Sequence, residues 1–441
     1  MSTTSSGPVN AFHQAIEVER QAPIYFVAVS VWRLVSDSLT FVRLFSTLCI
    51  LLSLVVLDRL GGLLGISNRY WSLGLLAGLT PQMLWAASEA RSYALLILLV
   101  SLALYTSALL WLREGAASRG VGVAYVASAS LAVLTFYYAA FVIAGQALTN
   151  LIRHDRRAFW VWPLLAVLVL PWTPVVAHEL SLEAAAQHAA GAIAGAPASP
   201  RLGSAIRSTP SAVAGSIFRS TPALLSGWGL MLVCALLTLL AVARVRSRSP
   251  VSPAELTAIV IATLVVTALS LLRLRSADIV QARHWSPATP VLLLLVALVI
   301  SRLAGRQARS LGSVAAVAIL AGATAQYQAR HSKEDWRDVA QWIAERAGPG
   351  EPIVFYGPNG SRPFLFYYRG TNPLVVESEA PTDSLIRKFH GIGALWLITR
   401  NGSTLDSARA ETSRRFAQTL RIDTTRTFPG ISVSRLTTAR E

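Results

Sequence analysis

Charged residues are scarce in this 441-residue sequence, and cysteines are fewer still. Only 14% of the residues are charged, whereas 53% are hydrophobic and the mean hydropathy is +0.50. This composition excludes a water-soluble fold of this length, a disordered chain and a collagen-like fibre. Cys49 and Cys234 lie far apart in apolar stretches, so a disulfide framework is not indicated. The composition is that of a membrane protein.

Several motifs of common enzymes are also missing. The chain contains no P-loop, no glycine-rich dinucleotide fingerprint and no HExxH motif, so nucleotide-driven and zinc-protease chemistry lack support. His13, His178 and His188 do not have the spacing of metal ligands, and we expect no zinc site. Residues 1–21 are polar and lack a basic-then-apolar layout, so we expect no cleavable signal peptide.

Positive charge, in contrast, is abundant, with a formal net charge of +16. Lys333 and Lys388 are the two lysines, so 37 of the 39 basic residues are arginines. Many of these arginines lie in short gaps between apolar runs, where positive charge sets the orientation of membrane helices. The charge therefore does not indicate a nucleic-acid-binding protein, and we expect no nucleic-acid partner.

Apolar runs long enough to cross about 30 Å of hydrocarbon predict a mainly α protein with about ten transmembrane helices. The runs lie near residues 41–57, 71–87, 92–112, 121–136, 138–152, 159–177, 224–243, 254–272, 286–302 and 311–327. Arginines concentrate in alternate gaps, which predicts that these gaps are cytoplasmic. The turn 88–91, the loop 273–285 and the chain after 328 then lie outside, as does the loop 178–223, which is long enough to fold over the outer face.

Two regions outside the transmembrane domain (41–327) have their own patterns. Residues 1–40 are predicted to be an outer segment in which 23–36, apolar but only fourteen residues long, forms an interfacial helix. If this helix crossed the membrane instead, residues 1–22 would be cytoplasmic. Residues 333–441 contain an amphipathic stretch at 333–348 and β-like runs at 352–356, 373–376, 394–399, 421–427 and 431–436. They predict an extracytoplasmic α/β domain.

Glu89 and Arg91 form the most distinctive local pattern, because they stand between two apolar helices at the outer boundary. Charges at that depth are costly unless they are used or paired. Arg91 offers a planar donor fork to a phosphate, and Glu89 is suited to orient that ligand or to accept a proton. The alternative is an ordinary turn with a partly solvated ion pair.

A second cluster lies in the outer loop 273–285 and consists of Arg273, Arg275, Asp278, Arg283, His284 and Trp285. Three arginines outside the cell oppose the usual orientation bias, so something outside should bind them. A lipid-linked phosphate fits, because it places an anion at headgroup depth. Attraction to bulk anionic lipid is the alternative.

Further candidates carry less information. Glu17 and Glu19 precede the interfacial segment, and either could act as general base toward an acceptor hydroxyl. They could equally be solvated acids on a mobile tail. Tyr137 and Tyr138 lie at an outer helix end, where aromatic residues are common in any membrane protein.

Five segments occur in a characteristic order and spacing: APIYFVAVSVWRLVSDSLTFVRLFSTL, PQMLWAASEARSYALLILLVSLALY, LTFYYAAFVIAGQAL, RHWSPATPVLLLL and EDWRDVAQWIAER. Together they resemble the bacterial members of the dolichyl-phosphate-mannose protein mannosyltransferase family, which are membrane glycosyltransferases of the GT-C superfamily. The resemblance extends from about residue 12 to about residue 370. Glu89, Arg91 and Tyr93 match the family's E-x-R-x-Y segment, and Pro23 and Tyr25 match its Pro-Pro-Leu-Tyr segment.

This resemblance implies a multi-pass enzyme of the bacterial plasma membrane that transfers a sugar from a polyprenyl-phosphate carrier, with inversion at the anomeric carbon. The acceptor would be a glycolipid, a glycan or a protein on the outer face. Basic residues of outer loops bind the carrier phosphate in the family, which here maps onto Arg91, Arg273, Arg275 and Arg283. The lipid-linked sugar would be a co-substrate, and a divalent cation is left open.

One departure from the family concerns the general base. Family members usually have a further transmembrane helix, followed by an acidic pair, before the region matched here. Three explanations stay open: the true start lies upstream, the protein is a degenerate member, or Glu17 or Glu19 substitutes for the missing acid. Glu89 is then the best remaining acid of the site.

Two other functions would also use arginines near a lipid phosphate. The first is a transporter or flippase of lipid-linked sugars, although the sequence lacks ionisable residues deep in the spans and lacks matching broken helices in two halves. The second is a non-catalytic subunit that binds the carrier lipid, which the missing acidic pair keeps open.

Overall fold

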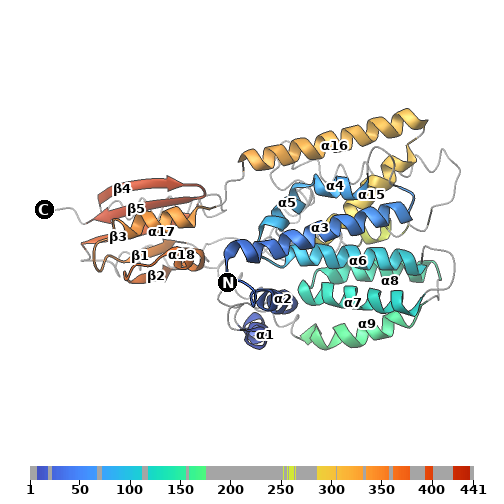
Figure 1. Ribbon diagram of the computed structural model, residues 1–441, viewed down its shortest axis with the longest axis horizontal. Helices are drawn as coiled ribbons and strands as arrows, with labels where there is room; N and C mark the ends of the chain where they lie inside the picture. The colour runs from blue at the N-terminus through green and yellow to red at the C-terminus, as the bar shows by residue number, and fades with distance from the viewer. Residues whose placement is uncertain are drawn as a thin grey trace, which may run out of the picture. The chain divides into compact units, whose positions relative to one another are not determined.

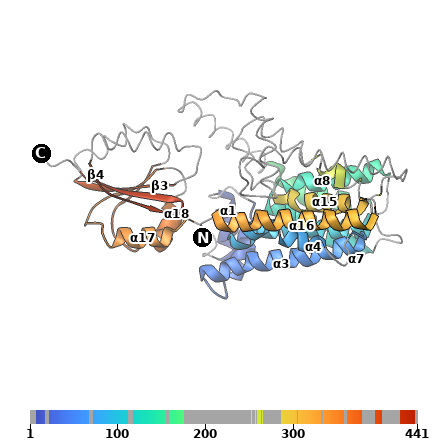
Figure 2. The ribbon, with the colours of Figure 1, turned by 90° about the horizontal axis from the view of Figure 1, so that it is seen from above.

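The structure, a computed structural model, describes the chain in separate stretches. These are residues 7–17, 22–66, 72–111, 118–154, 158–174, parts of 252–264, 286–303, 305–330, 334–356, 361–377, 393–400 and 421–437. The chain divides into two compact units, Met1–Gln328 and Ala329–Glu441, called here the membrane unit and the C-terminal unit. The first is helical and the second holds the sheet (Figure 1, Figure 2). The predicted class, mainly α with a small α/β part, is confirmed.

Helices make up the described part of the membrane unit. They are α1 (Pro8–Glu17), α2 (Ile24–Trp32), α3 (Leu39–Leu63), α4 (Leu73–Gly78), α5 (Pro81–Ser88), α6 (Tyr93–Trp111), α7 (Arg119–Thr135), α8 (Ala139–Ile152), α9 (Val161–Val169), the 3-10 turn η2 (Leu170–Trp172), α15 (Thr289–Arg302) and α16 (Gly305–Arg330). α6 is the central one, packed between α3 and α7. Figure 1 shows these three running side by side along the bundle.

Three of the described helices are long and apolar enough to cross a membrane: α3, α6, and α16 from Gly305 to Gln328. The segments Arg119–Thr135, Ala139–Ile152, Val161–Trp172 and Ser286–Ser301 are apolar but shorter. These helices mark an integral membrane protein. The predicted span near 224–243, most of the one near 254–272, and the loops 178–223 and 273–285 lie outside the described residues. The number of ten spans therefore stays a prediction.

The predicted span 71–87 is two helices, α4 and α5, rather than one. The break falls at Thr80, whose backbone is extended (ψ 125°), because a following proline disfavours the helical conformation and Pro81 lacks an N–H. The carbonyl groups released by the break are satisfied by hydroxyls. Thr80 Oγ1 donates to the Leu76 carbonyl at 2.9 Å, and Thr324 Oγ1 of α16 donates to the Leu79 carbonyl at 2.6 Å. Such compensation is required where no water is present.

Replacing Thr324 by Val should destabilise the membrane unit by about 1 kcal/mol, the scale of a hydrogen bond between transmembrane helices. The variant leaves the Leu79 carbonyl without its hydroxyl partner. Thr106→Val is the matched control, because Thr106 Oγ1 donates only within its own helix, to the Leu102 and Ala103 carbonyls. Unfolding in mixed micelles measures both. Equal losses of stability in the two variants would show that the hydrogen bond from Thr324 to the Leu79 carbonyl contributes no more than a hydrogen bond within one helix.

The N-terminal region forms two short helices. α2 has nine residues, about 14 Å of helix, so it is too short to cross the hydrocarbon core by itself. Trp32 joins it to α3: its Nε1 donates to the Phe41 carbonyl at 2.8 Å, and the two rings stack 4.8 Å apart. α1 was not predicted. It is a packed helix rather than a mobile tail, with Ala11 and Ala15 buried and Phe12 edge-to-face with Trp172.

The C-terminal unit is built around a five-stranded mixed sheet. Its elements are α17 (Trp336–Ala344), β1 (Ile353–Tyr356), α18 (Ser361–Tyr367), β2 (Leu374–Glu377), β3 (Ala394–Arg400), β4 (Arg421–Phe428) and β5 (Ile431–Thr437). The strand order is β2-β1-β3-β5-β4, parallel from β2 to β3 and antiparallel beyond. All five predicted β runs fall on these strands. Phe355, Trp396 and Val433 from three strands bury their side chains with Val339 of α17 and Phe364 of α18.

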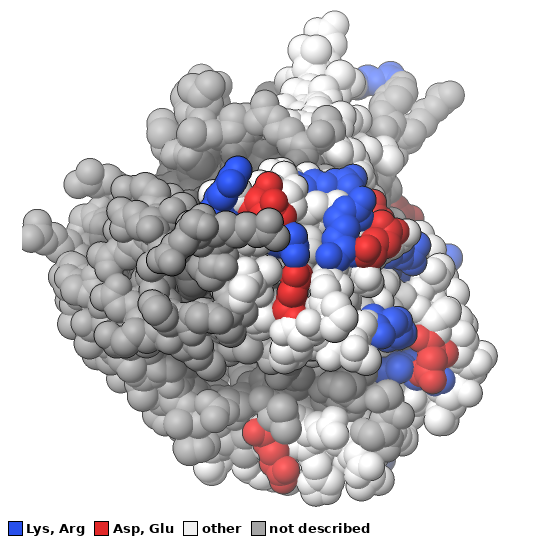
Figure 3. Space-filling view, turned by 90° about the vertical axis from the view of Figure 1, so that its left-hand side faces the viewer, with Lys and Arg blue, Asp and Glu red and all other residues white. Residues whose placement is uncertain are grey.

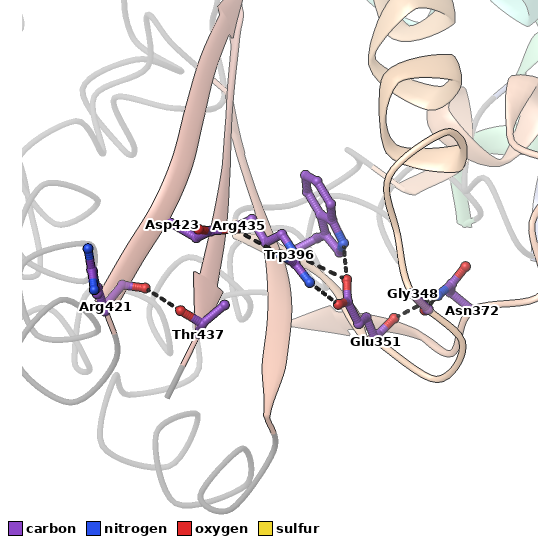
Figure 4. Close-up of polar contacts among 8 residues, drawn as sticks. All are labelled: Gly348, Glu351, Asn372, Trp396, Arg421, Asp423, Arg435 and Thr437. Atoms are coloured by element: carbon purple, nitrogen blue, oxygen red, sulfur yellow. Dashed lines mark hydrogen bonds and ion pairs between the residues drawn. The ribbon is translucent and has the colours of Figure 1, made fainter. Parts of the chain in front are cut away.

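A polar network joins the strands of this unit at Glu351, which lies two residues before β1 (Figure 4). The Glu351 carboxylate pairs with Arg435 of β5 and accepts a hydrogen bond from Trp396 Nε1 of β3 at 2.7 Å. Arg435 also pairs with Asp423 of β4 at 2.8 Å. Burial raises the pKa of Glu351, but the hydrogen bonds from Arg435 and Trp396 outweigh it and bring the pKa below its usual value. Figure 3 shows that charges of both signs are likewise intermixed over one face of the molecule.

Replacing Glu351 by Gln should lower the free energy of unfolding of the C-terminal unit by about 1–3 kcal/mol, because Arg435 loses a half-buried partner. A carboxyl whose pKa is lower in the folded state stabilises above its unfolded pKa of about 4.3, and this stabilisation is lost as the pH falls through the folded pKa. The variant should lack that acid-dependent loss. Hydrogen exchange of β3 and β5 in the full chain, corrected for intrinsic rates, measures both effects.

The control for this variant is Glu345→Gln. Glu345 pairs with Arg346 at 2.9 Å, but both side chains are about half exposed, so the loss of this pair should affect stability much less than the loss of the Glu351 pair. An equal effect of the two substitutions would contradict the stabilising role given to the Glu351 network.

Candidate functional site

The link between α5 and α6 consists of four residues, 89–92. α5 ends at Ser88, and the backbone of Glu89 is extended, with φ −97° and ψ 134°. Thr47 Oγ1 of α3 donates to the Ala87 carbonyl at 3.0 Å, which holds the end of α5 against α3. The link is therefore short and fixed on its α5 side, and its two charged residues, Glu89 and Arg91, are placed at one end of the bundle.

Tyr25 of α2 lies beside this link. Its side chain is 4% exposed and belongs to a small cluster with Val29 and Val42, against which Ala90 of the link packs. Burial raises the pKa of the Tyr25 hydroxyl well above its usual range, and the nearby Arg91 lowers it to a smaller extent. The hydroxyl therefore keeps its proton at neutral pH and is suited to donate a hydrogen bond rather than to act as a base.

Aromatic rings connect the link to the turn between α7 and α8. Tyr93 contacts Trp85 with ring centroids 4.9 Å apart and meets Phe136 edge-to-face at 5.7 Å. Phe136 in turn contacts Tyr138 at 5.2 Å. Tyr93 is 6% exposed, and Tyr137 and Tyr138 are partly buried. The structure thus brings Glu89, Arg91, Tyr93 and the two tyrosines to the same end of the bundle, as the sequence predicts.

Charge on the link is arranged in a way that suits an anionic ligand. Arg91 is exposed and Glu89 is partly exposed. Whether these two residues serve a ligand or form an ordinary turn with a partly solvated ion pair stays a prediction. A guanidinium in this position can bind an oxyanion, and the carboxylate two residues away can accept a proton.

The remaining predicted site residues are not all described. Glu17 is the last residue of α1 and is exposed. Glu19, Arg273, Arg275, Arg283 and His284 lie outside the described residues, so their place relative to Glu89 stays a prediction. Among the residues that the structure describes, no group of three His, Cys, Asp or Glu side chains is arranged to hold a metal ion.

Gln82 is a polar residue of this region that the sequence analysis missed. It is fully buried in α5, and its Nε2 donates to Ser286 Oγ at 2.8 Å. Ser286 is the residue that follows the predicted loop 273–285, and this hydrogen bond places it against α5. The signal was present in the sequence, because an amide inside an apolar run is costly unless it is paired.

Comparison with known proteins supports the fold. No protein-family model and no curated protein matches the chain. ArnT from Cupriavidus metallidurans is similar in two solved structures, each at 15% sequence identity over 94% of this chain. The apo state has a TM-score of 0.53 over 87% of its own chain, and the structure bound to undecaprenyl phosphate has 0.51 over 88%. The predicted GT-C-like fold is thereby confirmed, whereas the mannosyltransferase family stays a prediction.

Proposed function

We propose that this chain is an integral-membrane glycosyltransferase that moves a sugar from a polyprenyl-phosphate carrier to an acceptor hydroxyl. The likeness to ArnT over nearly the whole chain carries this proposal, because one of the two ArnT structures holds undecaprenyl phosphate. The exposed Arg91 beside Glu89 gives the same end of this bundle groups that suit a phosphate and a proton.

Arg91 would bind the carrier phosphate, with Arg273, Arg275, Arg283 and His284 as further partners from the loop that ends at Ser286. The hydrogen bond from Gln82 to Ser286 supports this grouping, since Ser286 directly follows that loop in the sequence. Residue 82 lies seven positions before Glu89, about 10 Å along a helix axis. The aromatic residues Tyr93, Tyr137 and Tyr138 would line the approach of the sugar or the carrier.

The reaction would be a single displacement at the anomeric carbon. The acceptor oxygen attacks C1, its proton passes to a carboxylate, and the bond between C1 and the phosphate oxygen breaks with its electron pair. Polyprenyl phosphate leaves as an anion, whose added charge the arginines stabilise. Glu89 is the proposed base, with Glu17 or Glu19 in its place if the acceptor enters from the α1 side. Tyr25, which keeps its proton, would donate a hydrogen bond in the same site.

We place the chain in the bacterial plasma membrane, with the link 89–92 and the C-terminal unit on the outer face. The distribution of arginines supports this orientation, because Arg59, Arg119 and Arg153 lie at the opposite ends of α3, α7 and α8 from the link. The acceptor would then be a glycolipid, a glycan or a protein outside the cell.

Reconstituted full-length chain tests the proposal. Proteoliposomes are supplied with radiolabelled polyprenyl-phosphate sugars and envelope acceptors, with and without EDTA, while carrier binding and movement of the label across the bilayer are measured separately. Transfer of the label to an acceptor is the expected result, and its loss in EDTA would add a divalent cation. Carrier binding without transfer would mean a non-catalytic subunit, and label movement without transfer would mean a flippase; each of these would overturn the enzyme assignment.

A further inference from the structure

The surface of α18 in the C-terminal unit presents apolar side chains that the core of the unit does not use. Leu365 is 44% exposed and Phe366 is 41% exposed. Their neighbour Phe364 is fully buried and stacks on Tyr368, so the helix is anchored from its inner side. Leu365 and Phe366 are therefore held outward by a well-packed helix. Transfer of these two apolar side chains out of water would be favourable, so they are available for contact with an apolar environment.

Basic residues border this surface. Arg337 of α17 is exposed and lies over the ring of Tyr367, 5.6 Å from its centroid, and Tyr367 meets Phe366 edge-to-face at 5.0 Å. Arg369, two residues beyond α18, is also exposed. Apolar and aromatic side chains with arginines at their border are suited to the headgroup layer of a bilayer, where rings and guanidinium groups contact the lipid phosphates.

A short linker joins the C-terminal unit to α16, a helix long enough to cross a bilayer. α16 has 26 residues, about 39 Å of helix, which exceeds the hydrocarbon thickness and ends at Arg330. Five residues separate Arg330 from Trp336, the first residue of α17. Six extended steps reach at most about 22 Å. This linker length limits how far the start of α17 can lie from the end of α16, and α18 packs on α17 within the same unit.

We infer that α18 docks the C-terminal unit on the phospholipid surface, with Leu365 and Phe366 inserted among the headgroups and Arg337 and Arg369 on lipid phosphates. The inference does not depend on the proposed transferase activity. Acidic residues weaken the electrostatic attraction of this surface to anionic lipid, because Glu334, Asp335 and Asp338 all lie near Arg337 at the start of α17. Insertion of the apolar side chains should therefore dominate, and docking should depend only weakly on salt.

Depth-dependent fluorescence quenching in nanodiscs tests this contact with the full chain. A fluorophore is placed at residue 366 by Phe366→Cys, in a background in which Cys49 and Cys234 are replaced. Ile422→Cys is the matched control, because Ile422 is a similarly exposed apolar residue (47%) of the same unit, on the edge strand β4. Nanodiscs contain phosphatidylcholine and phosphatidylglycerol, with a lipid carrying a nitroxide near its headgroup.

The expected result is quenching by the nitroxide lipid at least threefold stronger at position 366 than at position 422, with little change between 50 and 500 mM NaCl. Leu365→Glu should remove most of this difference, while hydrogen exchange of β3 confirms that the unit stays folded. Equal quenching at both positions, with access to aqueous iodide, would overturn the inference. Shielding of position 366 from both quenchers would also overturn it, because a protein surface would then cover α18.

Discussion

Replacing Glu89 by Gln should lower the rate of sugar transfer by about 10²- to 10⁴-fold, the range over which a general base contributes to catalysis. The amide keeps the size of the side chain but cannot take the proton of the attacking hydroxyl. Carrier binding should change much less than turnover, because the phosphate is assigned to the arginines. Turnover and carrier affinity measured on the same reconstituted preparation would separate the two effects.

Asp37→Asn is the control for this substitution. Asp37 lies between α2 and α3, near the same end of the bundle, and its exposed side chain pairs with Arg33 at 2.7 Å. Asn keeps an acceptor oxygen for Arg33 at this exposed position, so activity should stay near that of the original chain. If Glu89→Gln retains turnover within twofold, Glu89 is not the base, and Glu17→Gln becomes the next variant to measure.

Arg91→Gln should weaken the binding of polyprenyl phosphate by about 10- to 100-fold. A hydrogen bond between charged groups contributes about 1.5–3 kcal/mol, and Gln retains neither the charge nor the planar fork. The Arg91→Lys variant should have an affinity between those of the original chain and of Arg91→Gln, because an ammonium keeps the charge but loses the paired geometry of the guanidinium. Equilibrium binding of a short-chain polyprenyl phosphate in detergent measures the three affinities directly, without any requirement for turnover.

Arg119→Gln is the matched control for Arg91. Arg119 begins α7, and α7 ends beside Phe136 and the ring of Tyr93, so the guanidinium of Arg119 lies about 24 Å along the helix from the candidate site. Its loss should leave carrier affinity unchanged. Equal weakening by both substitutions would indicate general attraction to anionic headgroups and would contradict a specific phosphate site at Arg91.

Apolar runs located some helices of the membrane unit closely, although the predicted span 71–87 is two helices and α3 and α16 are longer than their predicted runs. α6 (Tyr93–Trp111) and α8 (Ala139–Ile152) agree with the predicted spans to within one residue at each end. The reason is that a helix in hydrocarbon satisfies its own backbone, so its position depends on local sequence alone. The β runs of the C-terminal unit were equally local. The packed helix α1 was not predicted, because its buried residues, Ala11 and Ala15, are only weakly apolar. Their burial depends on the helices that cover them, which the sequence does not identify.

Some residues of the candidate site were also found from the sequence, whereas others were found only in the structure. The sequence alone identified Glu89, Arg91 and Tyr93, because charges between two apolar helices stand out against their surroundings. It also determined the membrane class and the α/β character of the C-terminal unit.

Only the tertiary structure decided which residues far apart in the sequence contact one another. It brings Tyr25 to the link 89–92, Thr324 to a carbonyl 245 positions away, Gln82 to Ser286 across 204 positions, and Arg435 to Glu351 across 84. A single hydroxyl or amide has many possible partners of equal chemistry along a chain of this length. Helix packing and strand order select one of them, and neither is encoded in the local residue pattern.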